Sequence, residues 1–412
     1  MENTKKIFKL EGRIQHYAWG GYGYLPDLLQ VPNPTKKPFA EYWMGAHVNA
    51  PSMITISDDQ KLPLNELIAA EPGAMLGETV AQVFGRLPYL FKILDVKDML
   101  SIQVHPSKKD AVRGYEEENA REIPLNDTKR NYKDDNHKPE LMYALSDFWL
   151  LHGFKTPEKL HKVLADQPEL GFLQFIFQKK GYDGLYRYVM ELEQEDVNKV
   201  LQPLLDRIIP LYEKGMLKKN DEGFWAARAA ITFNEPGKID RGIFSIYIFN
   251  LVNLKPGEAI FQDAGLPHAY LEGQNVEIMA NSDNVLRGGL TPKHIDVPEL
   301  LKHVKCEPLV PAVILGIPSG NLGEEVFLTP AEDFELRVIR LNSGELTQLK
   351  VTTTDIFIVH SGAVKVTDGS NKLGRDAGDC FIAIYDADIS IAAPIRSVIF
   401  RSTVPAKLNK VD

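Results

Sequence analysis

Three short stretches of this sequence carry side chains that can bind a metal ion. The first, residues 101–106, reads SIQVHP. On a strand, Gln103 and His105 share one face with Ser101, while the residues between them point the other way into apolar packing. Buried polar side chains are costly unless a partner satisfies them, and a bound cation would do so. Taken alone, this pattern is more often the solvent-facing side of an edge strand.

The other two stretches add a carboxylate and a second imidazole. Glu140 follows NHKP and opens the apolar run LMYAL, so its carboxylate needs a cation or donors to stay ionised. His268 follows LP on an expected strand, where it shares a face with Tyr270. Alone, each is more often a structural residue. Together, Gln103, His105, Glu140 and His268 form a nitrogen and oxygen ligand set that suits zinc and leaves room for water or substrate, although glutamine is an uncommon zinc ligand.

Most of the chain reads as the strands that would hold these side chains. The runs are short, apolar or alternating, and rich in β-branched and aromatic residues. They lie at residues 88–96, 101–105, 246–254, 335–341, 354–360, 363–367 and 397–402. Turn pairs such as Pro256-Gly257 and Ser343-Gly344 separate many of them. Regular spacing of this kind predicts a β-barrel or jelly roll.

The middle of the chain has a different pattern. Thr156-Pro157-Glu158 is a typical helix start, and residues 184–215 carry apolar side chains at helical spacing before ending in Lys-Gly. Pro203 and Pro210 predict a break into more than one helix. We therefore expect a helical insert at 155–232. After about residue 310 the strand pattern returns, as in a second copy of the first β region that lacks its metal-type residues.

Bulk composition narrows the class of protein. The 412 residues carry a formal net charge of −9, with 44% hydrophobic and 25% charged residues, which disfavours nucleic acid and anionic membrane as partners. No apolar run reaches the roughly 18 residues of a membrane span, and the first residues lack a signal-peptide core. With only Cys306 and Cys380, a disulfide framework and a thiolate zinc site are both excluded. We expect a cytoplasmic protein, with a monomer as the working expectation for its oligomeric state.

Seven blocks of the sequence together resemble the type I phosphomannose isomerases over nearly the full length. Their order and joint presence are specific, although no single block is decisive. They are QHYAWG at 15–20, WMGAH at 43–47, LPYLFK at 87–92, LSIQVHP at 100–106, HKPE at 137–140, PHAYL at 267–271 and NSDNVLRGGLTPK at 281–293. The chain departs from the family at Ser107, where Asp is frequent, and at Val48-Asn49. Gln103-x-His105 replaces the general cupin His-x-His pair, which favours the isomerase branch.

The resemblance implies a mainly β fold made of two cupin-type jelly-roll β-barrels and an α-helical domain. The zinc-containing catalytic domain would comprise 1–154 and 233–310, the helical insert 155–232, and a cupin-like domain without metal 311–412. One zinc per chain would bind the four residues named above. The substrate would be a small sugar phosphate, mannose-6-phosphate or fructose-6-phosphate. The residues of the family's substrate pocket correspond to eight residues of this sequence: Ser101, His137, Lys138, Tyr270, Glu277, Asp283, Arg287 and Lys293.

Isomerisation of this kind would move a proton between C1 and C2 of the sugar through a cis-enediol. Glu277 and Lys138 are both candidates for the base, and the lysine would need a depressed pKa. Arg287 would stabilise the enediolate. His105, His137 and Asp283 are candidates for ring opening. Arg287, Lys293 and Ser101 would bind the phosphate, although Lys293 and Asp283 also suit an ordinary loop and turn.

Two other functions remain open at this point. A duplicated jelly roll can bind sugars without chemistry, and exchange of solvent protons into the sugar would distinguish a binder from an isomerase. An iron oxygenase would use two histidines and one carboxylate, which His105, His268 and Glu140 could supply. Gln103 as a fourth ligand favours zinc, and metal analysis of the purified protein separates the two.

Overall fold

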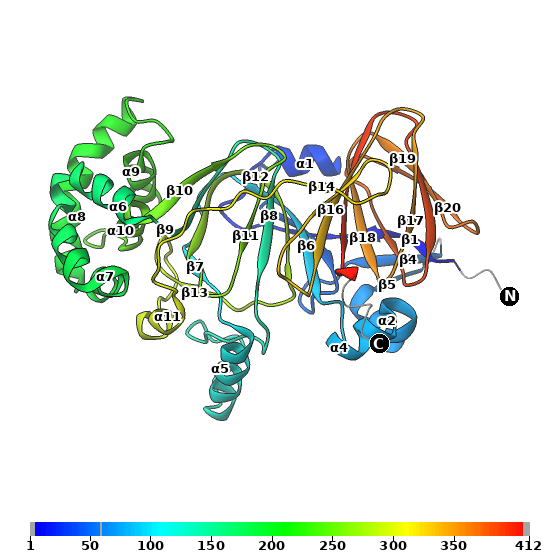
Figure 1. Cartoon of the computed structure of the whole chain (residues 1–412), viewed down its shortest axis with the longest axis horizontal. Coiled ribbons are helices and arrows are strands. Elements are labelled where there is room, and N and C mark those ends of the chain that lie inside the picture. The colour runs from blue at the N-terminus through cyan, green and yellow to red at the C-terminus, as the bar shows by residue number, and fades with distance from the viewer. Residues whose placement is uncertain (1–4, 58–59, 407–412) are drawn as a thin grey trace.

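The computed structural model describes residues 5–57 and 60–406, so the ends of the first and last predicted domains lie outside the described residues. More residues lie in strands than in helices, which confirms a mainly β chain with helices. Figure 1 shows three parts along the long axis: a group of helices at one end, a β-rich unit in the middle and a second β-rich unit at the other end. The middle unit therefore touches both of its neighbours.

The middle unit is built on a ten-stranded antiparallel sheet. Its longest strand pairs with four others and so brings distant segments together. The strands are β2 (Arg13–Gln15), β3 (Glu41–Gly45), β6 (Tyr89–Val96), β7 (Gln103–Val104), β8 (Glu140–Ala144), β9 (Phe148–Phe154), β10 (Phe249–Leu254), β11 (Ala259–Gln262), β12 (His268–Ala280) and β13 (Leu286–Arg287). The predicted metal ligands lie on or directly beside β7, β8 and β12.

The second β unit combines a nine-stranded and a four-stranded sheet. The first contains β14 (Ile317–Pro318), β15 (Glu324–Phe327), β16 (Glu335–Leu341), β23 (Ser397–Thr403), β18 (Asp355–Ser361), β21 (Cys380–Ala383), β1 (Ile7–Glu11), β4 (Met53–Ser57) and β5 (Gln60–Pro63). The second contains β17 (Leu346–Lys350), β22 (Asp388–Ala392), β19 (Ala363–Thr367) and β20 (Lys372–Asp376). Strands β1, β4 and β5 lie in this unit, although the predicted division placed residues 1–154 in the catalytic domain. The reason is that β1 pairs with β21 and with β4, which joins the N-terminal segment to the C-terminal strands.

Helices cover one end of the molecule and several edges. They are α1 (Tyr24–Leu29), α2 (Leu64–Ala70), α3 (Pro72–Leu76), α4 (Glu78–Phe84), α5 (Lys108–Ala120), α6 (Pro157–Ala165), the 3-10 turn η1 (Pro168–Leu170), α7 (Phe172–Glu191), α8 (Gln194–Glu213), α9 (Glu222–Phe233), α10 (Gly242–Ile248) and α11 (Val297–His303). Helices α6 to α10 form the end group in Figure 1. Their core includes Trp225 and is continuous with Ile102 and Val104, the residues on either side of Gln103. Helix packing thus supports the back of strand β7.

Two sequence predictions about this helical region are wrong. Helix α8 runs through Pro203 and Pro210 without a break. Its buried apolar residues, among them Leu201 and Leu204, continue at helical spacing across the first proline, and their burial outweighs the cost of about 3 kcal/mol for an interior proline. Residues 246–248, expected as the start of a strand, form the end of α10 because they are buried on all sides within the helical core.

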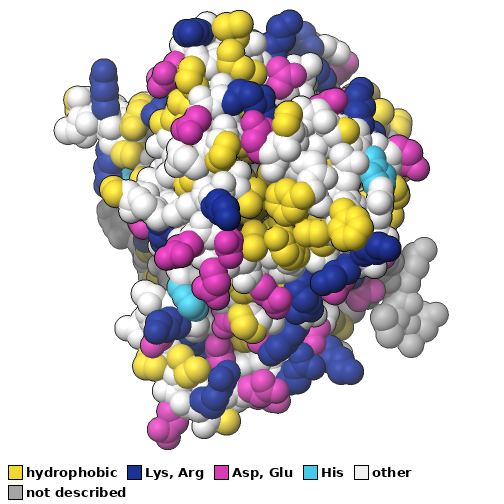
Figure 2. All heavy atoms as spheres, turned by 90° about the vertical axis from the view of Figure 1, so that its left-hand side faces the viewer, with side chains coloured by type: hydrophobic (Ala, Val, Ile, Leu, Met, Phe, Trp, Pro, Cys, Tyr) yellow, Lys and Arg dark blue, Asp and Glu magenta, His cyan; other side chains and the backbone are white. Residues whose placement is uncertain are grey.

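The outer face of the helical end carries an apolar patch among charged side chains (Figure 2). Phe172 and Phe175 of α7 are 40% and 64% exposed. A cavity of about 690 Å³ beside Phe172 is lined by residues of η1, α7 and α8, including Tyr188 and Val200. Among residues 5–57 and 60–406, no helix combines the length and the apolar character that crossing a bilayer requires.

A buried ionic cluster joins four strands of the second β unit. The Arg401 Nε atom donates to Asp355 at 2.8 Å, and its Nη1 atom donates to Glu324 at 2.7 Å. Arg337 also pairs with Glu324, at 3.0 Å. Burial alone would raise the pKa of Glu324, but Arg401, Ser319 and Arg337 lower it to about 2. Glu324 is therefore ionised at neutral pH, whereas burial raises the pKa of Asp355 against the opposing effect of Arg401.

Replacing Arg401 by Met should lower the free energy of unfolding by about 3–5 kcal/mol at pH 7, because two buried carboxylates lose their main partner. Since the folded-state pKa of Glu324 is depressed, the wild-type advantage is present above the ordinary glutamate range and is lost as pH falls toward about 2. Urea denaturation at several pH values measures this. Exposed Arg396→Met should stay within about 0.5 kcal/mol of wild type. Equal stability of R401M and wild type at pH 7 would contradict the prediction.

Candidate metal centre and active site

Three buried side chains converge inside the middle β unit. His105, Glu140 and His268 offer ligand atoms that all lie within 4.8 Å of one another, and no other such group of His, Cys, Asp and Glu occurs in the described parts of the chain. The Nε2 atom of His105 lies 3.4 Å from one oxygen of Glu140, and the Nε2 atom of His268 lies 3.2 Å from the other. The carboxylate therefore stands between the two imidazoles.

A hydrogen bond at the Nδ1 atom orients each of the two imidazoles. The Nδ1 atom of His105 lies 2.8 Å from the carbonyl oxygen of Asn284, and that of His268 lies 2.9 Å from the carbonyl oxygen of Leu266. A proton on each Nδ1 leaves each Nε2 free to bind a metal. The buried Nε2 atom of His105 makes no hydrogen bond with any described residue. Such an unsatisfied nitrogen fits a bound cation.

Local electrostatics favour the charge states that metal binding needs. Burial and the nearby Lys138 ammonium lower the pKa of His105 to about 4, which keeps the imidazole neutral. Burial would raise the pKa of Glu140, but Lys138 and His105 hold it well below its usual range. The Nζ atom of Lys138 lies 3.1 Å from Glu140. Two imidazoles and a carboxylate form a ligand set that zinc accepts.

Strand register places Gln103 beside this group. Gln103 on β7 is aligned with His268 on β12 and with Arg287 on β13. Val104 and Ile102 are fully buried in the helical core behind it. The alternation expected from the sequence is therefore present, with Gln103 and His105 on the face opposite the helices. Ser101 lies two residues before Gln103 and is half-buried.

A second buried network stands next to the candidate metal centre on β12. Tyr270 donates from its hydroxyl to Glu277 at 2.9 Å, and the Nζ atom of Lys92 lies 3.0 Å from the other Glu277 oxygen. Lys92 also lies 3.6 Å from Glu41, which accepts a hydrogen bond from the Trp43 indole. Burial raises the pKa of Glu277, although Lys92 opposes the shift. The network holds a carboxylate whose affinity for a proton exceeds that of an ordinary glutamate.

Lys92, Glu41 and His47 belong to this region but were not among the sequence-predicted site residues. Lys92 lies in the middle of the apolar run PYLFKILDV. A charged residue inside a buried strand is the sequence feature that could have identified it as a site residue. Its cation is buried and pairs with two carboxylates. His47 lies 3.2 Å from Asp283, and this imidazole lowers the Asp283 pKa against the effect of burial.

The structure separates His137 from its neighbour Lys138. While Lys138 pairs with Glu140, the Nε2 atom of His137 lies 2.9 Å from Asp333, which precedes β16 of the second β unit. His137 lines a cavity of about 450 Å³ together with Arg86 and Asp333. Successive residues of an extended chain point to opposite sides, so His137 is directed toward the second β unit.

Arg287 and Lys293 stand as two cations without acidic partners. Neither side chain makes a hydrogen bond or ion pair with residues 5–57 or 60–406. Burial lowers the pKa of Arg287. Burial and the charge of Arg287 lower the pKa of Lys293, because the two cations repel each other. Neighbouring cations that are partly desolvated and unpaired are suited to an anionic group such as a phosphate.

Comparison with known proteins adds an independent line of evidence. Residues 7–157 match the family model for the catalytic domain of type I phosphomannose isomerase. The chain is 37% identical over 395 residues to a mannose-6-phosphate isomerase of Salmonella typhimurium, covering 94% of this chain and 97% of the relative.

Two solved structures have the same fold throughout. A zinc-bound mannose 6-phosphate isomerase superimposes with a TM-score of 0.86, and the Salmonella typhimurium enzyme bound to fructose-6-phosphate and zinc with 0.85. Each is 32% identical to this chain, and each alignment covers 97% of this chain and 100% of the other. A likeness of this extent, with the candidate metal centre inside it, means that the chain belongs to the type I phosphomannose isomerase family.

Proposed function

We propose that this chain is a zinc-dependent aldose–ketose isomerase that interconverts mannose-6-phosphate and fructose-6-phosphate through a cis-enediol. The observation that carries the proposal is the buried group His105, Glu140 and His268, with ligand atoms within 4.8 Å of one another. A zinc-bound and fructose-6-phosphate-bound structural neighbour supports it.

One zinc ion would be held by Gln103, His105, Glu140 and His268. The unsatisfied Nε2 atom of His105 and the register of Gln103 beside His268 support this set. When bound, the zinc would supply a Lewis acid that polarises the sugar oxygens. The buried carboxylate and the two imidazoles would hold it together with the Gln103 side chain.

Glu277 is the better supported of the two candidate bases. Its raised pKa suits a group that must take a proton and return it near neutral pH. In the direction from mannose-6-phosphate, Glu277 would remove the proton from C2 and deliver it to C1, while the hydroxyl proton moves from O2 to O1. Lys138 is ion-paired with Glu140. We assign to it the stabilisation of negative charge that develops on the oxygens.

Ring opening needs a proton donor and acceptor at the sugar ring oxygen and O1. Of the three residues considered, Asp283 is the best supported because His47 forms a dyad with it at 3.2 Å. His105 would be engaged as a ligand, and His137 is paired with Asp333. Tyr270 would contact the substrate region through the hydroxyl that it donates to Glu277.

The substrate phosphate would bind to Arg287 and Lys293, with the Ser101 hydroxyl as a further donor. The unpaired state of both cations supports this assignment, because a dianionic phosphate would satisfy them. Arg287 lies beside Gln103 in the strand register.

We also infer that both β units are cupin-type jelly rolls. The middle unit would be the zinc-containing catalytic domain, residues 155–232 the helical insert, and the C-terminal unit from residue 311 a cupin-like domain without metal. The N-terminal strands that pair with the C-terminal unit make the two units depend on each other.

An enzyme-coupled assay for fructose-6-phosphate tests the proposed function directly. The zinc-loaded protein should convert mannose-6-phosphate, and in D₂O the product should acquire deuterium at C1. A sugar-binding protein would do neither. An iron oxygenase would contain iron and consume oxygen. Absence of fructose-6-phosphate formation by protein with one zinc per chain would overturn the proposal.

A further inference from the structure

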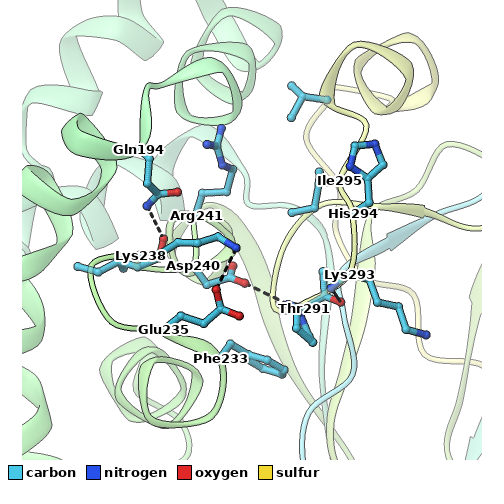
Figure 3. Close-up of a pocket in the computed structure, with 13 residues that line it drawn as sticks. Gln194, Phe233, Glu235, Lys238, Asp240, Arg241, Thr291, Lys293, His294 and Ile295 are labelled. Carbon is cyan, nitrogen blue, oxygen red and sulfur yellow. Dashed lines mark hydrogen bonds and ion pairs between the residues drawn. The ribbon is translucent and has the colours of Figure 1, made fainter. Parts of the chain in front are cut away.

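The loop that carries both unpaired cations is held by a carboxylate from outside the β unit. Asp240 lies between helices α9 and α10 and is 8% exposed. Its Oδ1 atom accepts hydrogen bonds from the backbone N–H groups of Gly242 at 2.7 Å and Leu290 at 2.8 Å. Its Oδ2 atom accepts one from Thr291 at 3.0 Å. Figure 3 shows Asp240 linked to Thr291 at one side of a cavity of about 310 Å³.

The backbone of this loop needs such support. Gly289 has a φ of 123° and Leu290 a φ of 55°, and the second is a conformation that leucine rarely adopts. The loop also packs tightly against α10, because a Cβ atom on Gly289 would lie 2.4 Å from the Cα atom of Gly242. The Asp240 carboxylate accepts two charge-assisted hydrogen bonds from this loop, at Leu290 and Thr291, and they offset the strain of this conformation.

The other side of the loop is joined to the strand that holds the substrate and metal candidates. The N–H of Gly288 donates to the carbonyl oxygen of Ile102 at 2.9 Å, and the N–H of Ile102 donates to Gly289 at 3.0 Å. Ile102 lies between Ser101 and Gln103. The loop is therefore fixed from two directions, and Arg287 and Lys293 stand at its two ends.

Asp240 is itself anchored to the helical insert. Its N–H donates to the Asn234 side chain at 3.0 Å, and the adjacent Ile239 is bonded to Gln194 and Asn198 of α8. A continuous series of hydrogen bonds thus runs from α8 through Asp240 to the loop. No other carboxylate in the described parts of the chain accepts hydrogen bonds from residues 288–291.

We propose that Asp240 is a positioning residue for the substrate phosphate. By holding the loop against the helices, Asp240 fixes where Arg287 and Lys293 stand relative to each other. This inference rests on the proposed function, because that function assigns the phosphate to these two cations. Displacement of a binding group by a fraction of an ångström weakens binding without removing the chemical groups that act at C1 and C2.

Kinetics of Asp240→Asn and Asp240→Ala test the proposal. In the zinc-loaded proteins, the KM for mannose-6-phosphate should rise about tenfold, and inhibition by inorganic phosphate should weaken by a similar factor. The kcat should stay within about threefold of wild type, with one zinc per chain retained. Glu235→Gln, which lines the same cavity and pairs only with Lys238, is the matched control and should keep wild-type constants.

Two results would overturn the inference. One is an unchanged KM and unchanged phosphate inhibition in folded D240N or D240A. The other is a loss of kcat and zinc as large as the rise in KM, which would mark a general structural role. Asn keeps one acceptor oxygen, so D240N provides a folded test if D240A unfolds. A wild-type protein without turnover would instead contradict the proposed function, and its binding of inorganic phosphate, compared with D240N by calorimetry, would still test Asp240.

Discussion

Replacing Glu277 by Gln should lower kcat by about 10²–10⁴-fold, because the amide keeps the shape of the side chain but cannot take a proton from carbon. The zinc content should stay at one per chain, since Glu277 lies outside the proposed ligand set. A steady-state assay with mannose-6-phosphate, together with metal analysis, measures both. Glu272→Gln on the same strand is the control: Glu272 pairs with Lys219 and Arg228, and this variant should keep the wild-type rate.

The pH dependence of the wild-type rate should reflect the same carboxylate. Burial raises the pKa of Glu277, with Lys92 opposing the shift. A base must be ionised to accept a proton, so kcat should rise with pH through this raised pKa. The acidic limb of the profile should therefore lie above the range of an ordinary glutamate, and it should be absent from the residual activity of E277Q.

Lys138 gives a complementary result that separates the two candidate bases. Lys138→Arg keeps a cation but cannot act as a base near neutral pH. If Lys138 stabilises charge, this variant should retain part of the rate, whereas Lys138→Met should lose most of it. A near-normal rate in E277Q, with complete loss in both Lys138 variants, would transfer the role of base to Lys138.

The period-two pattern of strands explains why the metal candidates could be predicted from the sequence. Gln103 and His105 alternate with two apolar residues, and the structure packs those two into the helical core. The same rule separates His137 from Lys138, which the family motif alone treats together. Strand periodicity therefore predicts which residues of a motif share a face.

Long-range pairing explains why other parts could not be predicted. Lys92 gains its role from Glu41 and Glu277, which are 51 and 185 residues away in the chain and meet it only through sheet register. Strand β1 joins the C-terminal sheet through β21, and nothing in residues 7–11 marks that partner. From the sequence, Asp240 is indistinguishable from an ordinary acidic loop residue, because its partners Leu290 and Thr291 are about 50 residues away in the chain. Local sequence patterns do not contain these contacts.

Removing the metal should abolish activity, and replacing Glu140 by Ala should do so permanently. Chelation of the wild-type protein should reduce kcat/KM by about 10³-fold or more, because a Lewis acid contributes several kcal/mol to stabilisation of the developing charge. Added zinc should restore the wild-type rate. In E140A the two imidazoles lose the carboxylate that stands between them, so the same zinc concentration should restore neither metal content nor turnover.

A readout other than activity strengthens this test. A metal that binds only the folded state raises the melting temperature, so zinc should raise that of the chelated wild-type protein and leave that of E140A unchanged. His360→Gln alters a histidine of the C-terminal unit that contacts Tyr24, and this control should still bind one zinc per chain. Full activity in protein shown to be free of metal would contradict the role of the metal. Since Lys138 would be left buried without its partner in E140A, restoration of zinc binding by Glu140→Asp would show that the missing ligand, and not a general loss of structure, causes the defect.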